Sequence, residues 1–328
     1  MRVFITGASG FIGRALYERY AADGHDVRGC DLVADPGRDV VSGDVGQRGA
    51  WQDHAAGCDL VIHTAATVSL RLERPDEVWR ANVLGTAHAL EAAGGGGATR
   101  FVHFSSVTAF GFDFPDGVEE TYPVHTTYVP YPDTKIASEQ VVLQAHIEGR
   151  ISATIVRPAD VYGPRSRAWA VIPVELIKAR RFTLPGGGRG IHSPVYIDNL
   201  VDGVVLAAAA PEAAGQIFTL SDGYGVPCRE FFQPHADLVG RRLMTLPTPV
   251  AVAGAAVVQR LARFQAGDND INPQSVRYML RRGTYSNTKA RSVLGWEPHV
   301  GVPEGLARTI EWLRGEGYGP DRPSHLRH

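Results

Sequence analysis

Three features are scarce in this 328-residue chain: cysteine, long apolar runs and an excess of one charge. The three cysteines form no C-x-x-C pair, so neither a disulfide framework nor a zinc site is expected, and a reducing compartment such as the cytoplasm fits best. The formal net charge of -2 gives no reason to expect a nucleic acid or an acidic membrane as partner. The twelve histidines show no metal-ligand spacing, and no metal is predicted.

No apolar stretch approaches the ~18 residues that a membrane-spanning helix requires. The N-terminal run before Gly7 is too short for the core of a signal peptide. The nearest candidate, Val250–Val258, predicts a buried or interface helix rather than a helix that associates with a membrane.

The first half of the chain alternates short β-branched runs with helical patterns. Strands are expected at 3–6, 26–30, 59–63, 100–105 and 153–156, and helices at 11–22, 76–93 and 132–146. This alternation is typical of a parallel sheet covered by helices on both faces, so the fold class is α/β with a Rossmann-type doubly wound sheet. The glycine cluster at 94–97 is predicted to be a loop.

The residues from 6 to 13 carry the most specific local pattern, because their three glycines follow a predicted strand and open a predicted helix. Glycine at this turn tolerates unusual dihedral angles and lets a pyrophosphate approach the backbone. The helix N-terminus then offers unpaired N–H groups and the positive end of its dipole. The pattern predicts a dinucleotide site formed by Gly7, Gly10, Phe11, Ile12 and Gly13.

Asp31 closes the second predicted strand, 18 residues after Gly13. An acidic side chain there accepts hydrogen bonds from both ribose hydroxyls of an adenosine and repels a 2′-phosphate. It predicts NAD rather than NADP as the cofactor, although Arg28 is close enough in the sequence to weaken that preference.

The rhythm of strands and helices changes after Pro164, where turn-rich pieces interrupt short helices. Residues 1–165 are therefore predicted to form an NAD-binding Rossmann domain, to which a segment at about 192–222 returns. Residues 166–191 and 223–328 are predicted to form a smaller, mostly helical, discontinuous substrate-binding region over the carboxyl edge of the sheet.

Tyr131 and Lys135 form a Y-x-x-x-K pattern at the start of a predicted helix, and their spacing places them on one face. A free tyrosine titrates near pH ~10, and a neighbouring ammonium, a helix N-terminus and a positive nicotinamide ring favour its phenolate. Tyr131 is predicted to exchange the hydroxyl proton, while Lys135 also holds the nicotinamide ribose. Ser106, at the end of a strand, is expected to hydrogen-bond the reacting oxygen, with Ser105 in a structural role.

Together these residues resemble the extended short-chain dehydrogenase/reductases, the superfamily of NAD-dependent epimerases and dehydratases, over almost the whole chain. Late landmarks of that family are matched by Val195–Asn199 and Leu294–Pro298. Many relatives pair two helices across a two-fold axis, so helices 76–93 and 132–146 are expected to form a homodimer interface. The resemblance implies further cofactor contacts at Asp44, Val45, Thr64, Ala65, Ala66, Asn82, Pro158 and Val161, besides Tyr131 and Lys135.

Departures from the family pattern narrow the chemistry. Sugar dehydratases carry an Asp-Glu pair directly after the catalytic hydroxyl, where this chain has Val107 and Thr108, so water elimination is not expected. Nucleotide-sugar members place an asparagine and an arginine near the substrate's phosphates, where this chain has Asp160 and Ile191, with Arg189 close by. A carboxylate there would repel a diphosphate. The chain is more similar to the branch of 3β-hydroxysteroid dehydrogenase-like oxidoreductases.

The sequence predicts an NAD-dependent oxidoreductase that interconverts a secondary alcohol and a ketone on a non-nucleotide, partly apolar small molecule. A nucleotide-sugar epimerase with a transient keto intermediate is the alternative, because the same catalytic residues serve both reactions. An idle NAD-binding sensor fits the intact catalytic set poorly. Phe110, Phe112, Phe114 and Trp169 either line an apolar pocket or are ordinary core residues, and His192 is a further candidate for a substrate contact.

Overall fold

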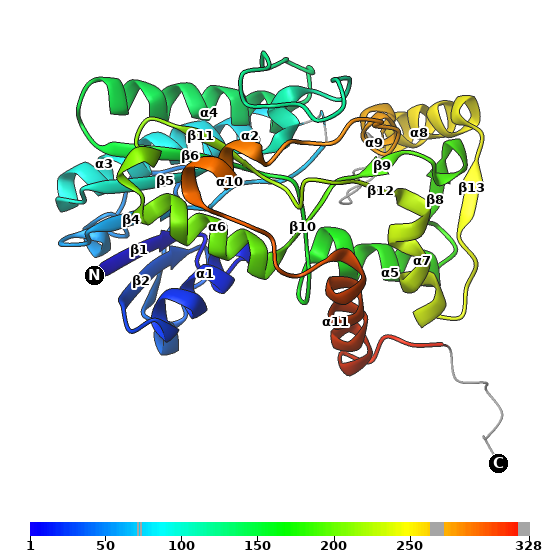
Figure 1. The fold of residues 1–328 in the computed structure, drawn as a ribbon, viewed down its shortest axis with the longest axis horizontal. Helices are drawn as coiled ribbons and strands as arrows, with labels where there is room; N and C mark the ends of the chain where they lie inside the picture. Colours follow the sequence, from blue (N-terminus) through cyan, green and yellow to red (C-terminus); the bar gives the residue numbers. More distant parts are fainter. Residues whose placement is uncertain (71, 73, 263–271, 321–328) are drawn as a thin grey trace.

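A seven-stranded parallel sheet forms the centre of the molecule (Figure 1). The computed structural model describes residues 1–70, 72, 74–262 and 272–320. The strand order is β11-β6-β5-β4-β1-β2-β3. β1 and β4 are parallel neighbours, and successive strands are added on one side of β1 up to β3 and on the other side from β4 onward. This order confirms the predicted α/β doubly wound, Rossmann-type sheet. The strands are β1 (Arg2–Thr6), β2 (Asp26–Asp31), β3 (Val40–Ser42), β4 (Leu60–His63), β5 (Arg100–Phe104), β6 (Ser152–Pro158) and β11 (Ile217–Leu220).

Helices cover both faces of this sheet (Figure 1). One face carries α1 (Phe11–Ala22) and α6 (Ile197–Ala209), which contact each other. The other face carries α3 (Gly85–Gly96) and α4 (Pro130–Ile147). Because both faces are covered, central strands are buried on both sides, and all four residues of β4 are buried.

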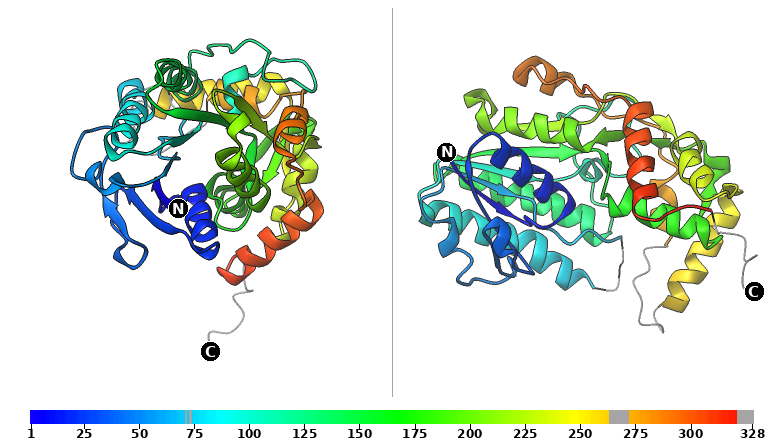
Figure 2. Two further views of the ribbon diagram at one scale, coloured as in Figure 1. Left: turned by 60° about the vertical axis from the view of Figure 1, so that its left-hand side comes forward. Right: turned by 90° about the horizontal axis from the view of Figure 1, so that it is seen from below.

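Most of the remaining elements gather at one end of the sheet (Figures 1 and 2). Three short ladders pair β7 (Asp160–Tyr162) with β10 (Pro194–Tyr196), β8 (Thr183–Pro185) with β13 (Met244–Leu246), and β9 (Ile191–His192) with β12 (Val226–Pro227). The other α-helices are α2 (Pro75–Trp79), α5 (Ile172–Lys178), α7 (Cys228–Leu238), α8 (Thr248–Ala262), α9 (Pro273–Tyr278), α10 (Thr288–Leu294) and α11 (Val302–Gly315). Shorter helical turns are η1 (Pro36–Arg38), η2 (Asp53–Ala55), η3 (Arg80–Leu84), η4 (Val107–Phe110), η5 (Arg167–Val171), η6 (Gly186–Gly188) and η7 (Pro211–Ala213).

Strand β11 comes from the segment at about 192–222 and pairs with β6 in the main sheet. The chain thus crosses into the smaller region after β7 and returns once to the sheet. The division into residues 1–165, with this returning segment, and 166–191 with 223–328 stays a prediction.

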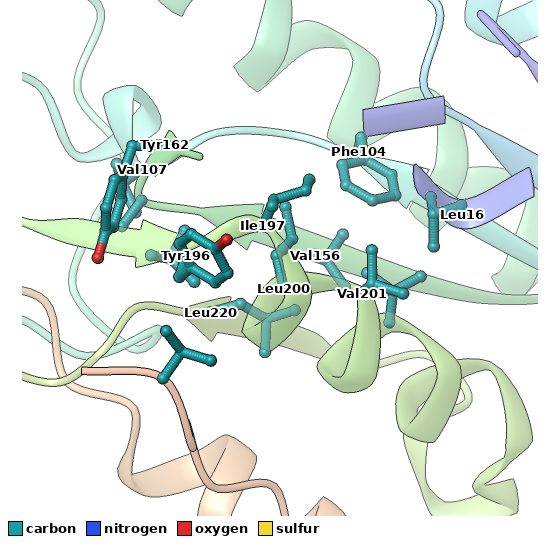
Figure 3. Close-up of a cluster of buried hydrophobic side chains, with 14 of the residues drawn as sticks. Leu16, Phe104, Val107, Val156, Tyr162, Tyr196, Ile197, Leu200, Val201 and Leu220 are labelled. Carbon is teal, nitrogen blue, oxygen red and sulfur yellow. The ribbon is translucent and has the colours of Figure 1, made fainter. Parts of the chain in front are cut away.

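A hydrophobic cluster joins α1 and α6 to the sheet (Figure 3). It includes Leu16 of α1, Phe104 of β5, Val156 of β6 and Leu200 of α6, each at most 4% exposed. A second cluster around Phe101 packs the opposite face against α3 and α4. Rotamers in such close packing are fixed, so the carboxyl ends of the strands form a rigid edge on which a site can be built.

The prediction of a loop at the glycine cluster needs correction: α3 continues through Gly96, and Gly97, with φ +81°, ends it in the left-handed conformation.

Helix α8 covers the predicted apolar stretch and is buried on one side, since Val250 and Val257 are 53% and 58% exposed while Ala251 and Ala255 are buried. The exposed side fits the interface form of the prediction, which stays a prediction. Within the described ranges, no helix is both long and apolar enough to cross a membrane.

Asn199 connects the two late family segments, Val195–Asn199 and Leu294–Pro298. It lies in α6 and is fully buried, and its side-chain amide donates to the carbonyl of Val300 at 2.9 Å and accepts from the backbone N–H groups of His299 and Val300 at 3.0 Å. Its own carbonyl accepts from the indole of Trp296 at 2.9 Å. One amide therefore fastens the C-terminal segment onto α6.

We expect Asn199→Ala to lower the free energy of unfolding by about 3 kcal/mol, because it leaves several buried backbone groups without partners. Chemical denaturation measures this change. Asp198→Ala, at an exposed neighbouring position of the same helix, is the matched control and should change stability by no more than about 0.5 kcal/mol. Equal effects of the two substitutions would contradict the proposed fastening role of Asn199.

Candidate active site

The glycine loop between β1 and α1 has the shape that a pyrophosphate needs. Gly7 has φ +71°, and a Cβ atom there would lie 2.8 Å from the backbone N of Ala65. A Cβ atom on Gly13 would lie 2.1 Å from the carbonyl oxygen of Gly7. Helix α1 begins at Phe11, so its N-terminal N–H groups, including that of Ile12, face the loop. Side chains at Gly7 and Gly13 would collide with the segment after β4 and with the loop itself, so this tight turn requires glycine, as the predicted dinucleotide site does.

Residues from the neighbouring strand ends surround this loop. The carboxylate of Asp31 accepts from the backbone N–H of Ser9 at 2.9 Å, which places it beside the glycine loop at the end of β2. Asp44 accepts from the backbone N–H of Gly46 at 2.9 Å, and Val45 is buried next to it. The Thr64 hydroxyl donates to the carbonyl of Thr6 at 2.7 Å, which ties the segment after β4 to the loop.

The remaining predicted cofactor residues take different positions. Ala65 and Ala66 follow Thr64 beyond the end of β4, while Pro158 ends β6 and Val161 lies in β7. Asn82 is 2% exposed, and its amide is already bonded to the backbone of Thr67 and to the hydroxyl of Thr134 at 3.0 Å. The structure thus gives Asn82 the task of holding the loop after β4 against α4.

The three predicted catalytic residues meet at the carboxyl end of β5. Ser106 directly follows this strand region and caps η4, and its hydroxyl also hydrogen-bonds Tyr131. Helix α4 begins at Pro130, one residue before Tyr131, and places Lys135 one turn further on. The Lys135 ammonium lies 5.8 Å from the centre of the Tyr131 ring and donates to the carbonyl of Phe104 at 2.7 Å.

Burial dominates the titration of this trio. It raises the pKa of Tyr131 to about 12, against the opposing hydrogen bond from Ser106. Burial also lowers the pKa of Lys135 to about 8, and the negative charge of Glu139 opposes that shift. The protein's own groups therefore hold Tyr131 as a phenol at neutral pH, and the prediction that the nicotinamide ring helps to form a phenolate stays a prediction.

A cavity of about 790 Å³ is lined by segments that lie next to these residues in the sequence. One wall comes from residues 110–114, directly after η4, and another from residues 125–128, directly before α4. Phe110, Phe112 and Phe114 all line it, together with Tyr128, which is 89% exposed. Arg277 and Arg282 contribute exposed guanidinium groups from the third wall. The cavity combines an aromatic lining with positive charge.

Trp169 and His192 lie elsewhere. Trp169 packs edge-on against His192 with ring centres 4.6 Å apart, and His192 is 1% exposed against Phe231. Burial lowers the pKa of His192 to about 4, so the ring is neutral. Neither residue lines the large cavity, and both belong to the core of the smaller region.

Asp160 does not present a charge to the substrate. It is 2% exposed, accepts from the guanidinium of Arg281 at 2.7 Å and receives the hydroxyl of Tyr278. Burial alone would raise the pKa of Asp160, but the guanidinium of Arg281 brings it below its usual range. The argument that this carboxylate repels a diphosphate is therefore wrong, because Arg281 already matches its charge.

Comparison with models of protein families shows which family the chain belongs to. The model of the NAD dependent epimerase/dehydratase family matches residues 3–220. This range includes the glycine loop, the three predicted catalytic residues and the strands of the main sheet from β1 to β11. The chain belongs to this family. It is therefore an NAD-dependent oxidoreductase of the extended short-chain type.

Characterised members of the NAD-dependent epimerase/dehydratase family span different chemistries. The chain is 31% identical to a farnesyl-dihydroquinoline-oxide ketoreductase of Stigmatella aurantiaca, over 93% of this chain and 95% of the relative. It is 30% identical to a UDP-glucose 4-epimerase of Mycolicibacterium smegmatis (96% and 99%) and 28% identical to a 3-beta-hydroxysteroid dehydrogenase of Mycolicibacterium neoaurum (95% and 91%). The structure of MoeE5 in complex with UDP-glucuronic acid and NAD is 26% identical, with a TM-score of 0.78 over 96% of this chain and all of that one.

The sequence did not predict one cationic residue beside the glycine loop, Arg38. Arg28 lies in ion pairs with Asp26 at 3.7 Å and with Asp39 at 3.9 Å. Arg38 of η1 instead donates to the carbonyl of Ala8 at 3.1 Å and to the hydroxyl of Ser9 at 3.2 Å. No motif marks Arg38, because a turn between β2 and β3 brings it back to the loop.

Asp31→Ser should weaken NAD binding about tenfold, ~1.4 kcal/mol, and strengthen NADP binding, because a repelling carboxylate disappears beside Arg38. Fluorescence titration with both dinucleotides measures the two affinities. The double variant Asp31→Ser with Arg38→Ala is the control and should lose the gain toward NADP. An unchanged cofactor preference in the single variant would remove Asp31 from the site.

Proposed function

We propose that the protein interconverts a secondary alcohol and a ketone on a non-nucleotide, partly apolar small molecule. The observation that supports this most directly is the aromatic part of the large cavity, where Phe112, Phe114 and Tyr128 come from the segments that follow Ser106 and precede Tyr131 in the sequence. Aromatic surfaces of this kind favour rings and aliphatic chains. The ketoreductase and hydroxysteroid dehydrogenase relatives act on substrates of that character.

In this mechanism Tyr131 transfers the proton at the reacting oxygen. Its hydroxyl donates to the carbonyl oxygen during reduction, and it receives the alcohol proton during oxidation. Ser106, already bonded to Tyr131, steadies the same oxygen as its charge develops. Lys135 holds positive charge below the tyrosine ring and would hold the nicotinamide ribose. Bound NAD supplies the acceptor or donor of the hydride.

Residues of the chain also suit the cofactor's other half. The glycine loop receives the pyrophosphate, and Asp31 beside it receives the adenosine ribose. The phenol form of Tyr131 at neutral pH is the form that reduction of a ketone consumes.

A second candidate, a nucleotide-sugar epimerase, is favoured by one observation of its own. Arg277 and Arg282 line the cavity with exposed guanidinium groups, which pair well with phosphate oxygens. A UDP-glucose 4-epimerase is also among the relatives. The charge of Asp160 no longer opposes such a substrate.

A coupled assay separates the two candidates. The purified protein is mixed with NAD and a panel of hydroxysteroids, aromatic secondary alcohols and UDP-, GDP- and TDP-sugars, and absorbance at the NADH band is followed. We expect net NADH with a free alcohol. A new sugar epimer on chromatography without net NADH would contradict the dehydrogenase proposal and establish the epimerase.

We also propose that the protein is a cytoplasmic homodimer that pairs through the α3–α4 side. Its three cysteines are free and buried, which suits a reducing compartment. Trp79 and Leu84, at the start of this helical segment, are 48% and 44% exposed, and a shallow depression of about 240 Å³ lies between Leu90 and Ile151. Apolar side chains in such positions gain by burial against a second copy.

Light scattering should give twice the 35.4 kDa chain mass. Leu84→Glu, which places a charge on the proposed interface, should shift the population toward monomer. Val293→Glu, at a similarly exposed position of α10, is the matched control and should leave the dimer intact. A wild-type mass of one chain would contradict the dimer.

A further inference from the structure

Glu139 lies below the catalytic trio, and sequence reasoning gave it no role. Its side chain is 1% exposed and is held on both oxygens. Oε1 accepts from the Ser105 hydroxyl at 2.5 Å and from Nε of Arg157 at 2.7 Å, while Oε2 accepts from Nη2 of Arg157 at 2.7 Å. Three bonds from β5 and β6 fix the carboxylate in one position.

The position of Glu139 on α4 makes this contact relevant to the site. Tyr131, Lys135 and Glu139 follow one another at four-residue intervals, so they occupy one face of the helix. The same carboxylate that holds Ser105 therefore sits one turn beyond the ammonium of Lys135, and Ser105 immediately precedes Ser106. One carboxylate therefore joins helix α4 to the strand end that precedes Ser106.

We propose that Glu139 is a positioning residue of the reaction: fixed by Arg157 and Ser105, it supplies the negative charge that faces the Lys135 ammonium from within α4. This inference rests on the proposed role of Lys135 beside Tyr131. Glu139 itself touches neither the reacting atoms nor the cofactor loop.

The other groups packed around Lys135 leave this task to Glu139. His63 of β4 and His103 of β5 are fully buried, and burial lowers the pKa of His63 to about 3 and that of His103 well below its usual range. Both rings are therefore neutral. The guanidinium of Arg157 on β6 shares the carboxylate of Glu139 with Lys135, and Tyr131 is a phenol.

Acidic residues of neighbouring elements lie outside this environment. Asp76 and Glu77 of the adjacent α2 are exposed, and water screens their charges. Among the described residues, Glu139 is the buried carboxylate that stabilises the charged form of Lys135, and it acts against the burial that lowers its pKa to about 8.

The test is the pH profile of Glu139→Gln. The amide keeps the shape and an acceptor for Ser105 but removes the charge, so Lys135 should lose its proton at a lower pH. We expect the alkaline limb of kcat/KM to move down by about one pH unit, with roughly tenfold lower activity at pH 9 and little change at pH 6. Glu304→Gln, in an exposed pair with Arg308, is the matched control and should leave the profile unchanged.

A second variant guards against a merely structural effect. Glu139→Gln leaves the buried Arg157 guanidinium without a carboxylate to balance its charge, whereas Glu139→Gln with Arg157→Met removes both charges. If the alkaline limb shifts in both variants, the positioning role is supported. A uniform loss of activity at all pH values, or an alkaline limb that returns to its wild-type position in the double variant, would overturn it.

Binding measurements separate this proposal from the proposed reaction. The affinity for NADH, followed by fluorescence from pH 6 to pH 10, also reports the charge of Lys135 and needs no substrate. If no alcohol or ketone in the panel turns over, the reaction proposal fails. The Glu139 proposal fails separately if Glu139→Gln leaves the pH dependence of NADH binding unchanged.

Discussion

The buried ion pair between Glu139 and Arg157 is the interaction on which the geometry of the site depends. It connects α4 to β6 and, through Ser105, to the end of β5. Arg157 also lies 4.7 Å from the centre of the buried Phe110 ring, so the same pair packs against η4, which follows Ser106. Removing one partner of such a pair leaves an uncompensated charge in the core, so the two residues depend on each other.

Electrostatics around this pair define what the site can do. Lys135 is the cation of the trio, since the histidines next to it are neutral and Arg157 is matched. Tyr131 enters the reaction as a phenol, and the hydrogen bond from Ser106 makes loss of that proton less costly. The Lys135 ammonium lies 5.8 Å from the centre of the same ring.

The sequence was sufficient for the sheet, the glycine loop and the closeness of Ser106 to Tyr131, because these follow from local patterns and from the rule that parallel strands end at one edge. It was insufficient where function depends on contacts between distant segments. Asp160 was expected to carry an unmatched charge, yet Arg281 lies against it from a segment 121 residues away. Arg38 and Glu139 were missed for the same reason.

Residue type alone also failed to separate pocket from core. Phe112 and Trp169 are equally aromatic, but Phe112 lines the large cavity while Trp169 packs on His192. Side-chain direction, which no single sequence encodes in a readable pattern, makes the difference. The helical course of the glycine cluster up to Gly96 is a further case, since packing against its neighbours outweighed weak helix propensity.

Single-turnover kinetics of Tyr131→Phe test the central claim most directly. The substitution removes one hydroxyl at a buried position, and dinucleotide affinity, measured separately by fluorescence, should stay within about threefold of the wild type. The account predicts that hydride transfer falls by at least about 10²-fold, because the proton has no other carrier at the reacting oxygen. Hydride transfer at the wild-type rate, with unchanged affinity for NAD, would contradict the account.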